Sequence, residues 1–173
     1  MYLLPAVGYS YAPCGQRPVI EADSKNKLKV SLSAVITPQG NLFYQVRQGT
    51  FNGAAIVRFI KKMHKHKKKD MILIWDGASI HTGQQVKNYL QEQEKQKRKV
   101  WLEKLPPYSP ELNPVEQMWA YLKNVLLKNQ VSKTLQELKL KVVAAMEIIK
   151  NDKELIKSFF RHPDIAFYAN STD

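Results

Sequence analysis

The fold of this chain is decided by two short stretches, WDGASIH at residues 75–81 and PPYSPELNPVE at residues 106–116. The first stretch follows an apolar run, so Asp76 is predicted to close a buried strand. The second stretch ends in the pattern of a helix start, so Glu116 is predicted to open an amphipathic helix. Two carboxylates delivered in this way to one end of a sheet can hold divalent metal for phosphoryl transfer.

Each of these carboxylates also has a purely structural explanation. Asp76 could open a turn, which is a common role of Asp. Asn113 fits an N-cap position, and Glu116 would then reach back to the cap as in a capping box. Glu111 is a rival ligand that spacing does not exclude. His81 is assigned a supporting role near the phosphate, although a histidine at a helix entry is more often a hydrogen-bonded structural residue.

Hydrophobic periodicity predicts the elements around the two stretches. Residues 28–36 and 42–47 alternate around a turn at 38–41, which predicts an antiparallel hairpin. Further strands are predicted at 9–18, 71–75 and 100–102, and helices after Asn52-Gly53, after the capping box at 82–85, from Pro114, from Thr134, and from Asp152 to before Pro163. The helix from Pro114 is predicted to bury one side, made of Val115, Met118, Trp119, Leu122, Val125 and Leu126.

This order of elements predicts the fold class. A hairpin followed by strand–helix–strand–helix–helix indicates an α/β chain with a mixed central sheet, an antiparallel hairpin plus parallel strands, and helices on both faces. The run at 71–75 is apolar at every position, as expected of a central strand covered on both sides. We expect residues 1–173 to form a single domain.

The charge of the chain indicates a polyanionic partner. Twenty-seven Lys and Arg face 15 Asp and Glu, which gives a net charge of +12. A field of that sign attracts nucleic acid. The candidate DNA-binding residues are Lys61, Lys62, Lys65, Lys67, Lys68, Lys69, Lys97 and Arg98. The lysines between residues 61 and 69 are explained equally well as the solvated end of a helix.

The remaining composition narrows the class of protein. Cys14 is the only cysteine, so an internal disulfide and a Cys-based zinc site are excluded. The apolar runs are too short for a membrane span, and residues 1–5 lack the pattern of a signal peptide. We expect a cytoplasmic protein with no membrane partner and no small-molecule cofactor.

Together the two stretches closely resemble the second and third carboxylate motifs of mariner/Tc1-like transposases and related bacterial insertion-sequence transposases, which are Asp-Asp-Glu endonucleases. The likeness is carried by Asp76 with Gly77, Ala78 and His81, and by the loop and helix start at residues 105–119. Residues 11–18 are also similar to the segment that follows the family's first catalytic Asp.

The resemblance implies an RNase H-like fold and metal-dependent DNA strand cleavage and strand transfer in cut-and-paste transposition of an insertion sequence. It implies that Asp76 and Glu116 are catalytic and metal-binding, that His81 and Asn113 support them, and that Mg²⁺ or Mn²⁺ occupies a two-metal site. The implied partner is DNA, at the element ends and at the target, and a homodimer is a family expectation.

The same resemblance implies a difference at the start of the chain. The family's first catalytic Asp would precede Met1, and the two-metal site is expected only if that Asp is supplied. We therefore expect an N-terminally truncated catalytic domain without its helix-turn-helix domain, inactive alone. The alternative is a non-catalytic DNA-binding or regulatory transposase fragment. An RNase H-type nuclease acting on RNA–DNA hybrids would share the fold without explaining the loop at 106–110.

Overall fold

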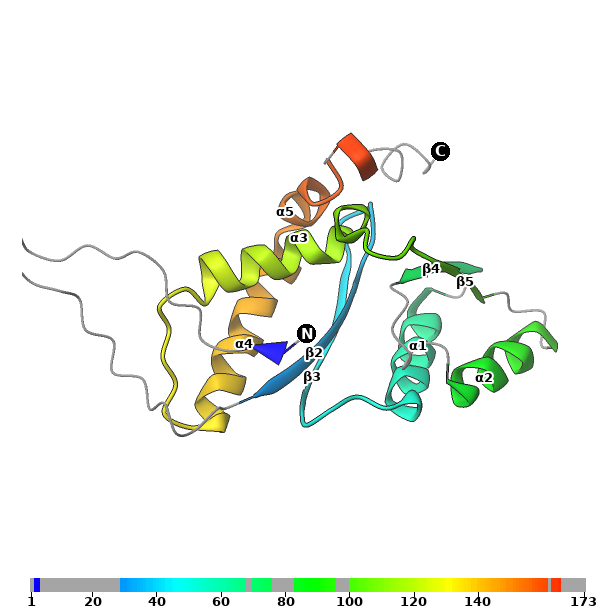
Figure 1. The fold of residues 1–173 in the computed structure, drawn as a ribbon, viewed down its shortest axis with the longest axis horizontal. Helices are drawn as coiled ribbons and strands as arrows, with labels where there is room; N and C mark the ends of the chain where they lie inside the picture. Colours follow the sequence, from blue (N-terminus) through cyan, green and yellow to red (C-terminus); the bar gives the residue numbers. More distant parts are fainter. Residues whose placement is uncertain are drawn as a thin grey trace, which may run out of the picture. The chain divides into compact units, whose positions relative to one another are not determined.

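A computed structural model describes residues 2–3, 29–67, 70–75, 83–95, 100–161 and 163–165 (Figure 1). The chain divides into two compact units. The hairpin unit comprises Met1–Gly49 and Pro114–Asp173, and the strand–helix unit comprises Thr50–Asn113. Each unit is described by itself below, and the single domain over residues 1–173 stays a prediction.

The hairpin unit contains a three-stranded antiparallel sheet in the order β1-β2-β3. Its strands are β1 (Tyr2–Leu3), β2 (Val30–Ile36) and β3 (Leu42–Gln48). The predicted hairpin is therefore confirmed, with Ile36 paired to Leu42 across the turn. Val30, Leu32 and Ile36 are buried because alternate residues of a strand point to one face. The strand predicted at 9–18 lies outside the described residues.

Helices supply the other side of this unit's core. They are α3 (Pro114–Tyr121), the π-helical turn η3 (Leu122–Leu126), α4 (Leu135–Asn151), α5 (Lys153–Ser158) and the short 3-10 turn η4 (Pro163–Ile165). α4 packs on β2 and β3, and α3 packs on β2. Met118, Met146 and Ile149 are fully buried between sheet and helices. The helices predicted from Pro114, Thr134 and Asp152 are confirmed.

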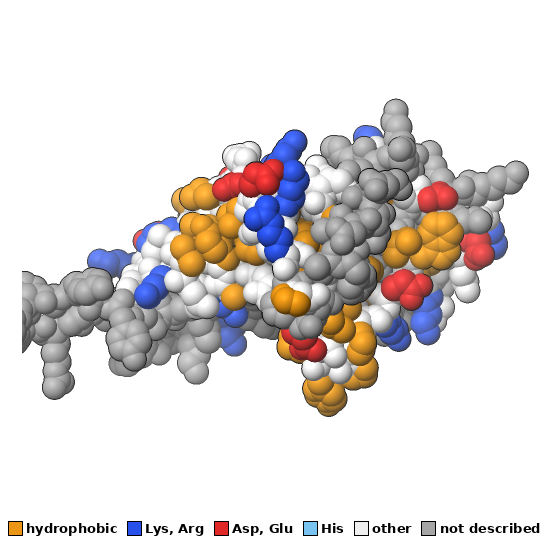
Figure 2. All heavy atoms as spheres, turned by 90° about the horizontal axis from the view of Figure 1, so that it is seen from above, with side chains coloured by type: hydrophobic (Ala, Val, Ile, Leu, Met, Phe, Trp, Pro, Cys, Tyr) orange, Lys and Arg blue, Asp and Glu red, His pale blue; other side chains and the backbone are white. Residues whose placement is uncertain are grey.

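Polar contacts also join the layers of the hairpin unit. The Tyr44 hydroxyl on β3 donates to Glu147 Oε1 on α4 at 2.7 Å. Burial and this hydrogen bond raise the pKa of Tyr44, and the same bond lowers the pKa of Glu147. On the face seen in Figure 2, basic and acidic side chains lie next to each other. On α5, the Lys157 ammonium group pairs with Glu154 Oε1 at 2.8 Å.

The helix from Pro114 does not continue as a regular α-helix. In η3 the Leu127 N–H donates to the Leu122 carbonyl oxygen at 2.9 Å, which is an i to i+5 bond. The extra residue in this turn rotates the chain beyond Leu122 relative to a straight helix. Val125 is 57% exposed and Leu127 is buried instead, so the prediction that Val125 faces the core was wrong.

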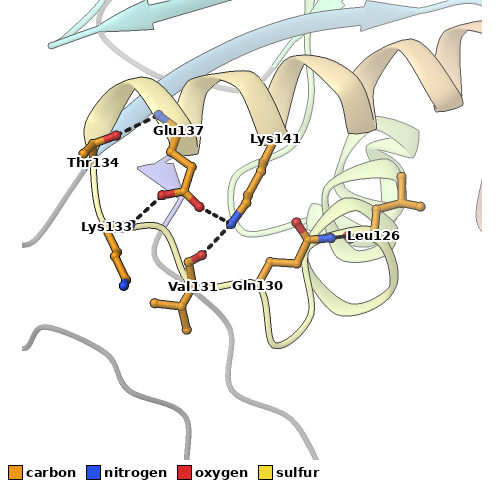
Figure 3. A network of polar contacts seen from close by, with 7 residues as sticks. All are labelled: Leu126, Gln130, Val131, Lys133, Thr134, Glu137 and Lys141. Atoms are coloured by element: carbon orange, nitrogen blue, oxygen red, sulfur yellow. Dashed lines mark hydrogen bonds and ion pairs between the residues drawn. The ribbon is translucent and has the colours of Figure 1, made fainter.

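A network of polar contacts fastens the loop between η3 and α4 (Figure 3). Thr134 caps α4 by accepting a hydrogen bond from the Glu137 N–H at 3.1 Å, while Glu137 Oε2 accepts from the Lys133 N–H at 2.9 Å. The Lys141 ammonium group pairs with Glu137 at 2.6 Å and donates to the Val131 carbonyl oxygen at 2.5 Å. The loop is thus held by the first two turns of the helix that follows it.

The strand–helix unit contains the parallel part of the fold. Its elements are α1 (Gly53–Lys67), β4 (Met71–Trp75), α2 (Gln84–Lys95), β5 (Val100–Lys104) and the 3-10 turn η2 (Pro110–Leu112). β4 pairs with β5 in parallel, α1 packs on α2, and α2 packs on β5. The antiparallel hairpin and the parallel pair confirm the predicted α/β class.

One face of β4 is buried and the other is not. Leu73 and Trp75 are buried, whereas Ile72 is 65% and Ile74 is 40% exposed. The second face of this strand is therefore uncovered by the described part of its own unit. Among the residues that the structure describes, no helix is long and apolar enough to cross a membrane.

Candidate functional site

Asp76 directly follows Trp75, where β4 ends as predicted. Asp76 and His81 themselves lie outside the described residues. The end of the strand is nevertheless well defined, because the Leu105 N–H donates to the Trp75 carbonyl oxygen at 3.0 Å. The chain that leaves β5 therefore begins its loop beside the end of β4, as the parallel pairing of the two strands requires.

The proline-rich loop from 105 to 113 has its own internal order. Ser109 Oγ donates to the Pro107 carbonyl oxygen at 3.3 Å, and the Leu112 N–H donates to the Ser109 carbonyl oxygen at 3.2 Å. Tyr108 adopts a left-handed backbone conformation, with φ of +58°. Three prolines (residues 106, 107 and 110) further restrict this segment.

Asn113 lies between η2 and α3 in the extended conformation of an N-cap, with φ of −106° and ψ of 100°. Its N–H donates to the Pro110 carbonyl oxygen at 3.0 Å. This N–H is also the expected partner of Glu116 in a capping box, and that contact stays a prediction.

Glu116 lies in the first turn of α3 and is exposed. Its backbone is fixed by the helix, while Met118 and Trp119 anchor the opposite side in the core. Glu111 is also exposed, in η2. Glu116 belongs to the hairpin unit, whereas Asp76 and Glu111 fall in the strand–helix unit. The assignment of Asp76 and Glu116 as a catalytic pair stays a prediction.

The described residues contain no group of three or more His, Cys, Asp or Glu side chains close enough to hold a metal ion. The metal ligands proposed from the sequence are Glu116 and Asp76, and Asp76 lies outside the residues that were searched. Carboxylate oxygens are the ligands that Mg²⁺ and Mn²⁺ prefer. The chemistry of the available donor at residue 116 thus fits a hard divalent cation.

The predicted basic residues fall partly on α1. Lys61, Lys62 and Lys65 are exposed on this helix, and Lys67 forms its last residue. The Lys61 ammonium group lies 5.3 Å from the centre of the Tyr89 ring on α2. Four of the predicted residues, Lys68, Lys69, Lys97 and Arg98, lie outside the described part of the chain.

Sequence reasoning missed one member of this surface. Arg58 is exposed on α1, one turn before Lys61 and Lys62. Its spacing of three and four residues to these lysines is the signal that could have found it. We call Arg58, Lys61, Lys62 and Lys65 the basic row. His64 is only 6% exposed, so it faces the interior and not the basic row.

Comparison with known proteins assigns the fold. A family described as DDE superfamily endonuclease matches residues 3–139. The Mos1 transposase paired-end complex with left transposon end is 16% identical, with a TM-score of 0.69 over 98% of this chain and 50% of that one. The Mos1 strand transfer complex is 17% identical, with a TM-score of 0.70 over 97% and 50%.

The catalytic domain of Mos1 mariner transposase, solved alone, is 18% identical, with a TM-score of 0.59 over 78% of this chain and 68% of that one. The chain thus spans about half the length of the Mos1 chains in the two complexes. No curated protein sequence matches the chain. At these identities the structural likeness establishes the fold, which is the predicted RNase H-like class.

Proposed function

The chain belongs to the DDE superfamily endonuclease family, and from this premise we propose that it is the catalytic domain of a transposase that cleaves and joins DNA strands with divalent metal. The observation that carries the proposal is the exposed Glu116 carboxylate at the start of α3, in the stretch that resembles the family's third carboxylate motif. Solved Mos1 structures are named as complexes with a transposon end and with Mg or Mn.

Asp76 and Glu116 are the residues that would hold the metal. A bound divalent cation supplies Lewis-acid stabilisation of phosphate charge and a lower pKa for an attacking hydroxyl. The chain's own residues do the rest. Glu116 presents its oxygens from a helix start that Asn113 and the buried Met118 keep in place. The basic row binds the sugar–phosphate backbone.

Metal binding is tested by titrating the purified chain with Mn²⁺ and following the free ion by electron paramagnetic resonance. Asp76→Asn and Glu116→Gln should each weaken Mn²⁺ binding at least about tenfold, because even supporting residues of metal sites contribute that much. Glu111→Gln is the matched control and should bind Mn²⁺ like the parent chain. Mn²⁺ affinity that is lost in Glu111→Gln and kept in Glu116→Gln would assign the site to the rival carboxylate.

Cleavage is measured as metal-dependent nicking of supercoiled DNA. We expect the chain alone not to nick DNA, so nicking that disappears in Asp76→Ala would overturn that expectation while supporting the catalytic role of Asp76. Nicking that persists in Asp76→Ala would contradict that role. RNA–DNA hybrids serve as the competing substrate, because preferential cleavage of the hybrid would favour an RNase H-type nuclease.

A second candidate is a non-catalytic DNA-binding or regulatory fragment, and the basic row favours it. These four side chains need no metal to neutralise phosphates. DNA binding in EDTA that Asp76→Asn leaves unchanged, in a chain that never nicks, is the result expected of this candidate. In both candidates the partner is DNA, and formation of a homodimer is a separate prediction that sedimentation equilibrium decides.

A further inference from the structure

Tyr108 combines two unusual properties. Its φ of +58° lies in the left-handed region, which Gly, Asn and Asp tolerate but which is unfavourable for a bulky residue such as Tyr. The residue is also fully exposed, at 101%. A strained backbone is normally compensated by packing of the side chain, but Tyr108 is exposed and so gains nothing from burial. Strain of this kind concentrates where a side chain serves a ligand.

The loop holds the ring of Tyr108 outward instead of letting it fold back. Pro106 and Pro107 precede it, and the Ser109 carbonyl oxygen accepts the first hydrogen bond of the η2 turn. Ser109 Oγ closes the loop onto the Pro107 carbonyl oxygen at 3.3 Å. A side chain whose backbone is already ordered loses less entropy when it binds, which favours binding.

The same loop places Tyr108 near the end of β4. Leu105, three residues before Tyr108, is hydrogen-bonded to the Trp75 carbonyl oxygen at 3.0 Å. Three residues span at most about 10 Å when fully extended. The backbone of Tyr108 therefore stays within that reach of Leu105, whose N–H lies against the carbonyl oxygen of Trp75, the residue before Asp76.

We propose that Tyr108 is a stacking platform for an unpaired DNA base, held next to the strand end that carries Asp76. This inference rests on the proposed function, since it presumes that DNA is the partner. An exposed phenol ring stacks on the face of any base, whereas bases inside a duplex are covered by their neighbours. The exposed Lys104 at the end of β5, which is paired in register with Trp75, adds a cation for the adjoining phosphate.

The test compares Tyr108→Gly with the parent chain in EDTA, which removes any contribution from metal. Gly relieves the left-handed strain, so this variant should unfold at the same or a higher temperature. It should nevertheless bind a single-stranded oligonucleotide about tenfold more weakly, and the fluorescence of a 2-aminopurine in that strand should no longer be quenched. Tyr108→Phe keeps the ring and should keep both the affinity and the quenching.

Asn129→Gly is the matched control, because Asn129 has nearly the same backbone conformation, with φ of +57°. It should leave the affinity for single strands unchanged. Tyr108→Gly should also leave the affinity for a fully paired duplex unchanged, because no base is available there. A Tyr108→Gly chain that binds single strands as tightly as the parent, or that loses duplex binding equally, overturns the inference and leaves the proposed function standing. A parent chain that binds neither kind of DNA overturns the proposed function itself.

Discussion

Gly40 shows how a single residue sets the hairpin turn. Its φ of +81° lies in the left-handed region, and a Cβ added to it would stand 2.8 Å from the Lys153 carbonyl oxygen. The turn between β2 and β3 thus touches the start of α5 with no room for a side chain. Gly49 has a similar φ of +78°, but nothing lies within 4 Å of its Cβ position.

These two glycines give a prediction that separates backbone strain from close approach. Gly40→Ala should lower the free energy of unfolding by about 2–4 kcal/mol, since strain and a backbone clash act together. Gly49→Ala should cost only about 1 kcal/mol, from strain alone. Urea denaturation of both variants measures the difference, and equal losses would show that the contact with Lys153 is unimportant.

At the scale of elements, the π-helical turn η3 decides which side chains after Leu122 enter the core. Leu127 is buried and Val125 is exposed. Leu127→Ala should therefore cost about 2–5 kcal/mol of unfolding free energy, as for other buried leucines. Val125→Ala should change it by less than about 0.5 kcal/mol, as for other exposed positions. Thermal unfolding of the two variants measures both losses of stability. A larger loss in Val125→Ala than in Leu127→Ala would indicate a regular helix through residue 126.

The polar network at the start of α4 makes a second prediction at this scale. The hydrogen bond from Lys141 and the backbone N–H of Lys133 hold the pKa of Glu137 below its ordinary value of 4.5. A carboxylate whose pKa is lower in the folded state stabilises the fold above its unfolded pKa, and this stabilisation is lost as the pH falls through the lowered folded value. The parent chain should therefore exceed Glu137→Gln in stability at pH 6.

This advantage should shrink below pH 4.5 and vanish in stronger acid. Urea unfolding at a series of pH values measures it. A difference in stability that persists unchanged in acid would mean that Glu137 acts through packing and not through its charge.

At the scale of the whole molecule, the net charge of +12 is too general a feature to locate a DNA surface. The basic row is a specific candidate. Replacing Arg58, Lys62 and Lys65 by Gln should weaken duplex binding and reduce the salt slope of log K by up to about 2.7, or roughly 0.9 for each lost phosphate contact. Lys61 is left in place because it also lies over Tyr89.

The control for net charge replaces Lys128, Lys139 and Lys153, which are exposed in the hairpin unit. That variant loses the same three charges and should retain most of the salt slope. Fluorescence anisotropy at several salt concentrations measures both. Equal loss in the two variants would mean that the overall field, and not the basic row, attracts DNA.

The hairpin and the α-helices were predictable because the residues of a buried face recur in the sequence with the period of the strand or helix. The alternation from Val30 to Ile36 and the spacing of Leu138, Val142 and Ile149 are such periods. The π-helical turn was not predictable, since one extra residue in a turn changes no composition. The left-handed Tyr108 gave no signal either, because neither Gly nor Asn marks the position.

The candidate site was predictable as two motifs and not as a geometry. Glu116 lies in the first turn of a helix as predicted, and the Asn113 N–H before it donates to the Pro110 carbonyl oxygen, which was not predicted. That bond depends on the 3-10 turn η2, and a turn of three residues is too short to show a hydrophobic period in the sequence. Asp76 and His81 stay predictions of the sequence.

The bond between the Leu105 N–H and the Trp75 carbonyl oxygen joins main chain to main chain. Any residue with an amide hydrogen can make it, so substitution can alter every side chain around it without releasing the loop from the strand end. Only proline at position 105 removes the donor outright. Sequence divergence can therefore replace the side chains on either side while this backbone hydrogen bond persists. Two chains that share few amino acids can still turn at the same place.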